Sequence, residues 1–491
     1  MTNLNTAPKT QYAVEGQSSI EAVSSSSMSL LNNPLIDCSG EVLGVSGLTL
    51  SISDRMGLLE IGARVRICMP SAPENSGAGD ILAEVVGLGE GQAQVLPFAS
   101  AQGVHRGARV IFEGRARAPR PTQGWLGRVV NGLGEPIDGE GPLPKGADRV
   151  VLRGTPPPAA SRARLGERID FGIKALDSFT PARAGQRLGI FSGSGVGKSS
   201  LLGMFARHTA CDVRIIALIG ERGREVREFI DDELGPDGLA QSIVIVSTAD
   251  EPALMRREAG YLAMALAEHF RDQGQHVLCM MDSLTRIAMA QREIGLAAGE
   301  PPATKGYTPS VFSLLPALLE RAGPGLMIDP EHPERKSGAI TGLFTVLVEG
   351  DDHDEPIADH ARAILDGHIV LDRAIADRGR FPAINILRSL SRTAADTMSE
   401  SECDAYIKAR QHAALHESMA DMITLGAYKP GTNPDIDIAI DFCARLEEFL
   451  TQARDTRSDQ TDSHQALVKI LTDLADKRAN SVEPQMAMIG Q

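Results

Sequence analysis

The sequence has no excess of basic residues and no long apolar run, and these two absences exclude several classes of protein. Asp and Glu number 64 against 49 Lys and Arg in 491 residues, which gives a formal net charge of -15. Binding along a nucleic acid backbone needs a basic surface, so nucleic acid is not expected as the main partner. No apolar stretch approaches the roughly 18 residues that would span a bilayer, and the polar N-terminus lacks the apolar core of a secretory signal. We therefore expect a soluble protein that works at a membrane only through partners.

The sequence also lacks paired cysteines. Its six cysteines are scattered and none forms a CxxC pair; they are Cys38, Cys68, Cys211, Cys279, Cys403 and Cys443. This spacing is typical of reduced, buried thiols in a cytosolic protein. It argues against a disulfide framework and against a zinc site.

The N-terminal part of the chain changes character at about residue 34. Residues 1–33 are rich in Ser, Asn, Thr and Gln, which predicts a flexible tail. Over residues 34–116, short runs rich in Val and Ile alternate with Gly, Asp and Asn turns. These runs are too short for helices and predict a small antiparallel β-barrel.

The rest of the chain predicts an α/β fold followed by helices. Residues 117–392 alternate strand-like apolar runs with helical stretches, which is typical of a mostly parallel sheet covered by helices on both faces. Residues 393–455 show helical apolar spacing and predict a helical domain. Residues 456–491 open with a polar stretch, contain one amphipathic piece and are expected to form a C-terminal tail.

The strongest local signal is a glycine-rich loop between a strand-like run, RLGIF, and a helix-forming run, SLLGMFARH. Its backbone N–H groups would form an anion site at a helix N-terminus. Lys198 would reach the β- and γ-phosphates of ATP, and the Ser199 hydroxyl would hold Mg²⁺. The strict P-loop pattern has glycine where Ser192 stands. The predicted nucleotide-binding residues are Ser192, Gly193, Ser194, Gly195, Val196, Gly197, Lys198 and Ser199.

Two further carboxylate signals follow strand-like runs. Asp282 ends HVLCMMD, 84 residues after the loop lysine, and a carboxylate at such a strand tip orients Mg²⁺ in P-loop ATPases. Glu221 and Glu225 follow VRIIALIG, and a carboxylate there would polarise the attacking water. The composition of this segment leaves the choice between these two glutamates open.

Three segments make the chain resemble the flagellum-specific export ATPases, whose wider group includes the type III secretion ATPases and the rotary ATP synthase β subunit. They read GERGREVREFI, MDSLTRIAMAQREIGLAAGEPPATKGYTPSVFSLLPALLERAG and GRVVNGLGEPIDGEGPL. The resemblance covers roughly residues 35–450 and implies a RecA-like P-loop core. It implies that Glu225 is the catalytic carboxylate, and that Lys198, Ser199 and Asp282 have the roles given above.

The same resemblance implies three more site residues. Phe381, which precedes Pro-Ala-Ile, is similar to the aromatic residue that stacks on adenine. Arg392, which closes SLSR, corresponds to the arginine finger that reaches into the neighbouring subunit's site. Tyr428 in GAYKPGT would close the adenine pocket, although a core role is an equal alternative for this residue.

We weighed the export ATPase against four alternatives. A non-catalytic subunit of a mixed ring, such as the α subunit of ATP synthase, would lack both glutamates of GERGRE. A hexameric RNA helicase would need aromatic residues for base stacking, and residues 34–116 contain only Phe98 and Phe112. An ATP synthase β subunit would carry an acidic lever sequence that is missing between residues 393 and 452. An injectisome ATPase remains an alternative, although the residues of the middle segment favour the flagellar type.

The resemblance also implies an assembly and a place in the cell. We expect a homo-hexameric ring that hydrolyses ATP and energises protein export. A regulatory, stator-like protein would bind the N-terminal tail, and the export gate, chaperones and export substrates would be further partners. The expected location is the cytoplasm, at the inner face of the cytoplasmic membrane. The sequence does not identify the substrates or the role of residues 456–491.

Overall fold

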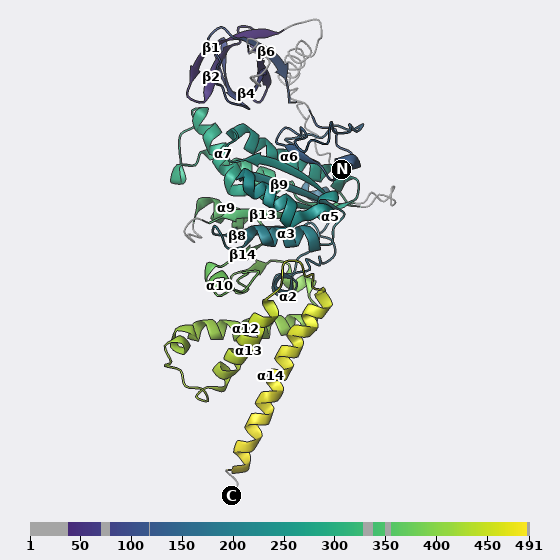
Figure 1. The fold of residues 1–491 in the computed structure, drawn as a ribbon, viewed down its shortest axis with the longest axis vertical. Helices are drawn as coiled ribbons and strands as arrows, with labels where there is room; N and C mark the ends of the chain where they lie inside the picture. The colour runs from purple at the N-terminus through teal and green to yellow at the C-terminus, as the bar shows by residue number, and fades with distance from the viewer. Residues whose placement is uncertain (1–37, 70–78, 117, 328–336, 349–354, 489–491) are drawn as a thin grey trace, which may run out of the picture. The chain divides into compact units, whose positions relative to one another are not determined.

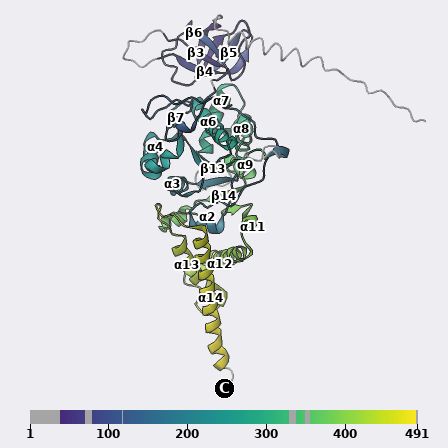
Figure 2. The same ribbon diagram turned by 90° about the vertical axis from the view of Figure 1, so that its right-hand side faces the viewer.

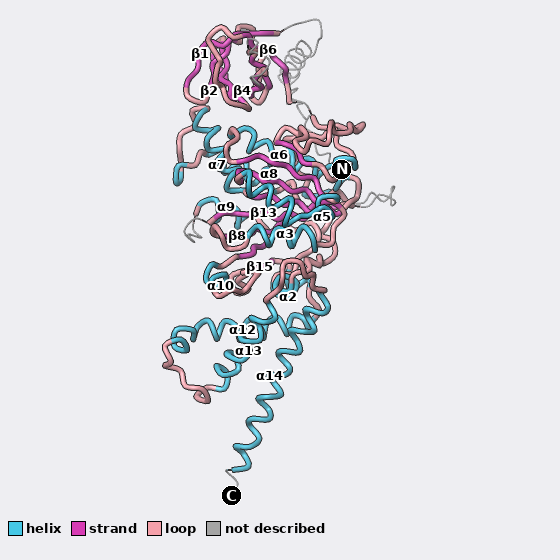
Figure 3. The backbone as a smooth tube through the Cα atoms, in the orientation of Figure 1, coloured by secondary structure: helices cyan, strands magenta, loops and turns pink. Residues whose placement is uncertain are grey.

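The computed structural model describes residues 38–69, 79–116, 118–327, 337–348 and 355–488, with side chains described up to residue 475. The chain divides into two compact units that meet in sequence at Ala118. The predicted tail at residues 1–33 lies outside the described residues. Figure 3 distinguishes the strands, helices and loops along the described chain.

The first unit is a closed antiparallel barrel, which confirms the expectation for this segment. Its core is formed by small and β-branched side chains that alternate along each strand; in β2, Leu50 and Ile52 are fully buried. Closure pairs every strand on both sides and leaves no open sheet edge. In spatial order the strands are β1 (Ser39–Ser46), β2 (Thr49–Ser53), β5 (Gln92–Pro97), β4 (Ile81–Gly89), β3 (Arg64–Ile67) and β6 (Arg109–Gly114).

Strands β3 and β4 of the barrel also carry a buried charge pair. Arg64 lies 3.5 Å from Glu84, and its guanidinium stacks over the ring of Phe98 at 4.0 Å from the centroid. Phe98 and Phe112 are only 6% and 7% exposed. Because both rings are buried, they are withdrawn from the surface on which an RNA helicase would stack bases.

The second unit contains a mostly parallel sheet, as predicted. In spatial order its strands are β15 (Leu390–Ser391), β14 (Gly367–Val370), β8 (Arg187–Ser192), β13 (Ala339–Leu347), β11 (His276–Asp282), β9 (Val213–Glu221), β10 (Ser242–Thr248) and β7 (Val129–Asn131). Only β15, on β14, and β12 (Gly323–Pro324), on β13, pair antiparallel.

Helices cover both faces of this sheet (Figures 1 and 2). Side chains alternate along β9, so that Ile216 and Leu218 face one core while Ile215 and Ala217 face the other. On the first face lie α2 (Lys174–Phe179), α3 (Lys198–His208), α4 (Gly223–Glu228) and the π-helical turn η3 (Phe229–Leu234). On the second lie α6 (Ala253–Asp272), α7 (Leu284–Ala297), α8 (Pro309–Leu319) and α9 (Pro356–Ile364).

Helix α2 holds a buried carboxylate. Asp177 accepts the backbone N–H groups of Phe171 at 3.0 Å and Ile173 at 2.9 Å. Burial raises the pKa of Asp177 to about 8, although the two N–H groups oppose this shift. The chain before α2 is thereby fixed by a carboxyl group that sits away from the loop of residues 193–197.

The C-terminal part is helical, in line with the sequence pattern. Its helices are α12 (Glu400–Thr424), α13 (Pro434–Leu450) and α14 (Gln460–Met488). Helix α12 begins at a capping box, in which Ser399 and Glu402 each bind the other's backbone N–H. Helix α14 occupies the segment that we expected to form a tail, because Leu467 and Leu474 are buried against the helices beside it.

Short elements complete the second unit. They are η1 (Gln123–Trp125), η2 (Ala159–Ser161), α5 (Gly235–Ala240), η4 (Thr304–Gly306), α10 (Arg373–Asp377) and α11 (Ala394–Thr397). The predicted boundaries after residues 116, 392 and 455 stay predictions. Within the described ranges, no helix combines the length and apolar character that crossing a membrane requires.

Candidate active site

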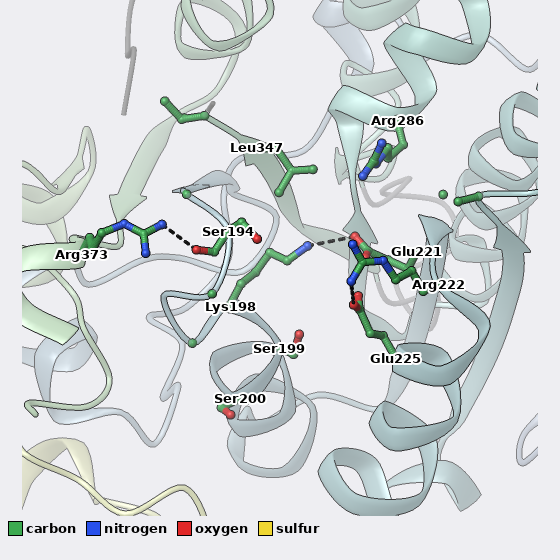
Figure 4. A pocket seen from close by; sticks show the side chains of 16 residues that line it. Ser194, Lys198, Ser199, Ser200, Glu221, Arg222, Glu225, Arg286, Leu347 and Arg373 are labelled. Carbon is green, nitrogen blue, oxygen red and sulfur yellow. Dashed lines mark hydrogen bonds and ion pairs between the residues drawn. The ribbon is translucent and has the colours of Figure 1, made fainter. Parts of the chain in front are cut away.

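The carboxyl ends of four neighbouring strands, β8, β13, β11 and β9, meet at one edge of the sheet. In such sheets this edge is where ligands bind. A cavity of about 680 Å³ lies there, lined by residues 193–200 with the exception of Val196, and by residues that follow the other strand ends. Figure 4 shows side chains from these segments converging on it.

The glycine-rich loop forms one wall of the cavity. Gly195 and Gly197 have φ values of 76° and 91°, a left-handed backbone that residues with a Cβ rarely adopt. Helix α3 begins directly after this turn, at Lys198. Ser192 and Val196 are each only 1% exposed, so they anchor the loop to the core, and the other predicted loop residues line the cavity.

Lys198 is held between two carboxylates. Its Nζ donates to Asp282 Oδ1 at 2.6 Å and to Glu221 Oε1 at 3.1 Å (the latter dashed in Figure 4). Burial alone would lower the pKa of Lys198, but the two carboxylates together outweigh it and raise the pKa. The lysine is therefore positively charged and can bind an anion.

Asp282 ends β11, at the tip where the sequence placed it. It is 4% exposed, and its Oδ1 also accepts the Thr345 hydroxyl at 2.6 Å. Oxygen ligands of this kind suit Mg²⁺, which is usually held by one or two carboxylates, substrate phosphates and water. In the described part of the chain, no group of three or more His, Cys, Asp and Glu side chains forms a dedicated metal cage. Ser199 lines the cavity, and Asp282 is joined to it through Lys198. A hydroxyl and a carboxylate are oxygen donors of the kind that Mg²⁺ takes.

The two glutamates of GERGRE occupy different environments. Glu221 is the last residue of β9, and its side chain is 16% exposed beside Lys198. Glu225 lies in the first turn of α4, is 43% exposed and pairs with Arg222 at 3.1 Å (Figure 4). Both line the cavity, and Glu221 is the one in contact with the lysine.

The sequence analysis missed three arginines that line the cavity. Arg286, one turn after Asp282, has a buried Nε without a hydrogen-bond partner among the described residues. Arg373 donates to the carbonyl of Ser194 at 2.7 Å and so fixes the glycine-rich loop from α10 (Figure 4). With Arg222 they bring positive charge to the cavity. Each follows a strand end closely in sequence, and this position is the signal that could have identified them.

The predicted adenine residues are placed differently. The ring of Phe381 lies beside the loop, because a Cβ added to Gly197 would be 3.5 Å from Phe381 Cδ1, and the side chain is 47% exposed. The hydroxyl of Tyr428 instead donates to Asp437 Oδ1 at 2.9 Å and to the Asn433 carbonyl at 3.0 Å. These contacts tie Tyr428 to the start of α13, and neither Tyr428 nor Phe381 is among the residues that line the cavity.

Arg392 follows the edge strand β15, outside the cavity of its own chain. It is exposed, and its guanidinium makes one long contact of 3.4 Å with the carbonyl of Arg362. A side chain in this position cannot act on the Lys198 site of its own chain, and it is accessible to a neighbouring molecule.

Comparisons with known proteins agree with this geometry. The profile described as "ATP synthase alpha/beta family, nucleotide-binding domain" matches residues 172–391, and that of the "T3SS EscN ATPase C-terminal domain" matches residues 398–469. The flagellum-specific ATP synthase of Caulobacter vibrioides is 52% identical over 433 residues, which cover 88% of this chain and 95% of that protein. The chain belongs to the family of flagellum-specific and type III secretion ATPases.

Other members of this family are also similar over most of the chain. The type 3 secretion system ATPase of Xanthomonas euvesicatoria is 45% identical and covers 80% of this chain and 86% of its own length. The solved structure of the assembled ATPase EscN from enteropathogenic E. coli is 37% identical, with a TM-score of 0.79 over 88% of this chain and 99% of EscN. The export ATPase family predicted from the sequence is therefore confirmed, and the chain is a P-loop ATPase.

Proposed function

We propose that this chain hydrolyses ATP with Mg²⁺ in a homo-hexameric ring that energises protein export through a flagellar type III apparatus. The observation that carries the proposal is the cavity in which Lys198, held by Glu221 and Asp282, faces the backbone of the glycine-rich loop. The flagellum-specific relatives support the flagellar setting, and the secretion ATPases support an injectisome as the alternative.

Different residues of the site would bind different parts of ATP·Mg²⁺. The loop amides and Lys198 would bind the β- and γ-phosphoryl oxygens, and Lys198 would leave its carboxylate partners for them. Ser199 and Asp282 would hold Mg²⁺, which when bound neutralises charge that develops on the phosphoryl oxygens. Phe381, beside the loop, would stack on adenine.

We propose Glu221 as the carboxylate that orients and polarises the attacking water, although the family resemblance pointed to Glu225. Glu221 ends a rigid strand, is mostly buried and lies 3.1 Å from Lys198 Nζ, so it sits beside the position of the terminal phosphate. Glu225 is more exposed and is already paired with Arg222. Glu225 stays the second candidate for this role.

A matched pair of variants tests this choice. Glu221→Gln is expected to lower turnover by about 10² to 10⁴, the range typical of general-base catalysis, with ATP affinity retained. Glu225→Gln is expected to lower turnover less. Steady-state turnover and equilibrium nucleotide binding, measured on both proteins, decide the matter. The reverse order of effects would give the role to Glu225.

We propose that Arg392 acts in the neighbouring subunit's site. The side chain is exposed at the edge strand, and EscN has been solved in an assembled form. Activity per subunit should therefore rise with protein concentration as rings form. Arg392→Ala should lose about 10³ to 10⁵ of turnover, as removal of an arginine finger does. Unchanged turnover in this variant would remove Arg392 from the mechanism.

The proposed partners follow from the relatives. EscN has been solved with its central stalk EscO, and we propose that this ring binds a stalk protein of the same kind. We further propose a regulatory protein at the N-terminal tail, contacts with the export gate, chaperones and substrates, and a cytoplasmic location at the membrane. Flagellin export, measured in a flagellated bacterium whose own export ATPase gene is replaced by this one, tests the flagellar role. Export restored by the native chain and lost with Lys198→Ala would support it.

A further inference from the structure

Glu233 is a buried carboxylate that the mechanism above does not use. It lies in η3, which continues from α4, and its side chain is 12% exposed. Ser200 Oγ donates to its Oε1 at 3.0 Å, the guanidinium of Arg207 lies 3.7 Å from its Oε2, and that of Arg454 lies 3.6 Å from Oε1. One carboxylate thus joins α3, η3 and the connection between α13 and α14.

One face of α3 is shaped around this carboxylate. Ser200, Gly203 and Arg207 are spaced three and four residues apart, so they lie on the same side of the helix. A Cβ added to Gly203 would be 2.7 Å from Glu233 Oε2 and 2.9 Å from Glu233 Cβ. The two backbones therefore approach as closely as they do only because position 203 has no side chain.

We propose that Glu233 is a positioning residue for ATP hydrolysis, which fixes the first turn of α3 and so aims the Ser199 hydroxyl into the cavity. Successive helix residues are about 100° apart around the axis, so Ser200 cannot change direction without turning Ser199. The inference rests on the proposed role of Ser199 as a Mg²⁺ ligand. Figure 4 shows Ser199 and Ser200 together in this first turn.

The charge of Glu233 strengthens its contact with helix α3. A buried carboxylate is costly unless cations and hydrogen bonds compensate it. Here Ser200 donates to Oε1 and the guanidinium groups of Arg207 and Arg454 lie nearby, while Oε2 accepts no hydrogen bond among the described residues. The same segment also begins with the two glutamates of the cavity, four and eight residues before η3. By binding α3, Glu233 therefore holds the cation ligand and the water-orienting carboxylate at a fixed separation.

The test compares four single variants by their dependence on free Mg²⁺. Ser200→Ala and Glu233→Gln remove the contact from either side. Glu228→Gln is the matched control, because Glu228 is an exposed glutamate of α4 paired with Arg224 at 3.0 Å. Ser418→Ala controls for loss of a serine, since its hydroxyl binds only the carbonyl of Leu415 in α12 among the described residues.

The expected result is a shift in metal dependence. Ser200→Ala and Glu233→Gln should raise the Mg²⁺ concentration for half-maximal turnover by about tenfold, the equivalent of one hydrogen bond to a charged group. The two controls should match the native protein. The double variant should be no worse than Glu233→Gln alone, because both changes remove the same contact.

The variant Ser199→Ala separates the two proposals. A shift in Ser199→Ala, with none in Ser200→Ala or Glu233→Gln, would overturn the positioning role of Glu233 and leave the proposed function intact. No shift in Ser199→Ala would overturn the metal role of Ser199 and the positioning role together. A fall in Tm without a change in Mg²⁺ dependence would show that Glu233 only stabilises the fold. Ser200→Ala carries the test should Glu233→Gln fail to fold.

Discussion

Arg64 in the barrel and Lys198 in the ATPase domain are both buried cations that face carboxylates, but their surroundings differ. Arg64 has Glu84 on one side and the ring of Phe98 on the other, and all three side chains are buried. Lys198 has two carboxylates on one side and a cavity of about 680 Å³ on the other. The first cation has a fixed set of contacts, while the second can exchange its contacts for those of a ligand. An open side, more than burial or pairing, distinguishes the binding lysine from the structural arginine.

The largest expected effect is the loss of ATP turnover when Lys198 is removed. Lys198→Ala should lower turnover by on the order of 10² to 10³, the loss typical when one electrostatic donor is removed from a reacting centre. The fold should persist, because Glu221 lines the cavity and can be solvated there once the lysine is removed. Turnover and circular dichroism would be measured on the same samples. Near-normal turnover would mean that the lysine does not bind the phosphates.

The complementary variant is Arg64→Ala, which should lower the free energy of unfolding and leave ATP turnover unchanged. Removing one partner of a buried pair leaves Glu84 without this counter-charge, and the typical cost is about 3–5 kcal/mol. Denaturant unfolding would measure this loss, and turnover per folded molecule should stay at the native value. If activity fell while the barrel stayed stable, the pair would have a role beyond holding its domain.

Asp177 extends the comparison to a buried carboxyl group whose charged form is disfavoured. Because the pKa is raised to about 8 in the folded chain and is about 4 when unfolded, the folded state binds the proton between these values. Stability is therefore expected to fall as pH rises from about 4 to about 8. Asp177→Asn should flatten this part of the curve of unfolding free energy against pH. The same slope in both proteins would contradict the shifted pKa.

The smallest effect is expected for Tyr428→Phe. The hydroxyl of Tyr428 binds Asp437, in the first turn of α13, and the carbonyl of Asn433, the residue that caps this helix. Its loss should lower Tm slightly and leave the KM for ATP unchanged. Phe381→Ala, in contrast, should raise that KM. A raised KM in Tyr428→Phe would return this residue to the adenine pocket that the family resemblance suggested for it.

The sequence predicted those parts of the site that are contiguous or that end a strand. The loop at residues 193–199 and Asp282 were found because phosphate-binding backbone and strand-tip carboxylates have local patterns. Choosing between Glu221 and Glu225 depends on where β9 ends, and a pattern does not locate element boundaries to within one or two residues. In the fold, the barrel and the parallel sheet followed from short and alternating apolar runs.

Other residues could not be found in this way. Glu233 meets helix α3 only after distant segments pack together, and no fixed spacing relates it to the glycine-rich loop. Helix α14 was expected as a tail because its first residues are polar, yet Leu467 and Leu474 bury enough apolar surface to order it against neighbouring helices. Tertiary contacts decided each of these cases.

The close approach of Gly203 to Glu233 limits which residues homologues can have at position 203. Every amino acid other than glycine at position 203 would place a carbon 2.9 Å from Glu233 Cβ and 3.3 Å from its backbone carbonyl oxygen. Because these atoms remain whatever side chain stands at 233, a side chain at 203 would have to push η3 away from α3. Homologues with a larger residue at 203 are therefore expected to hold these two segments farther apart and to lack the contact between residue 233 and the nucleotide-binding helix.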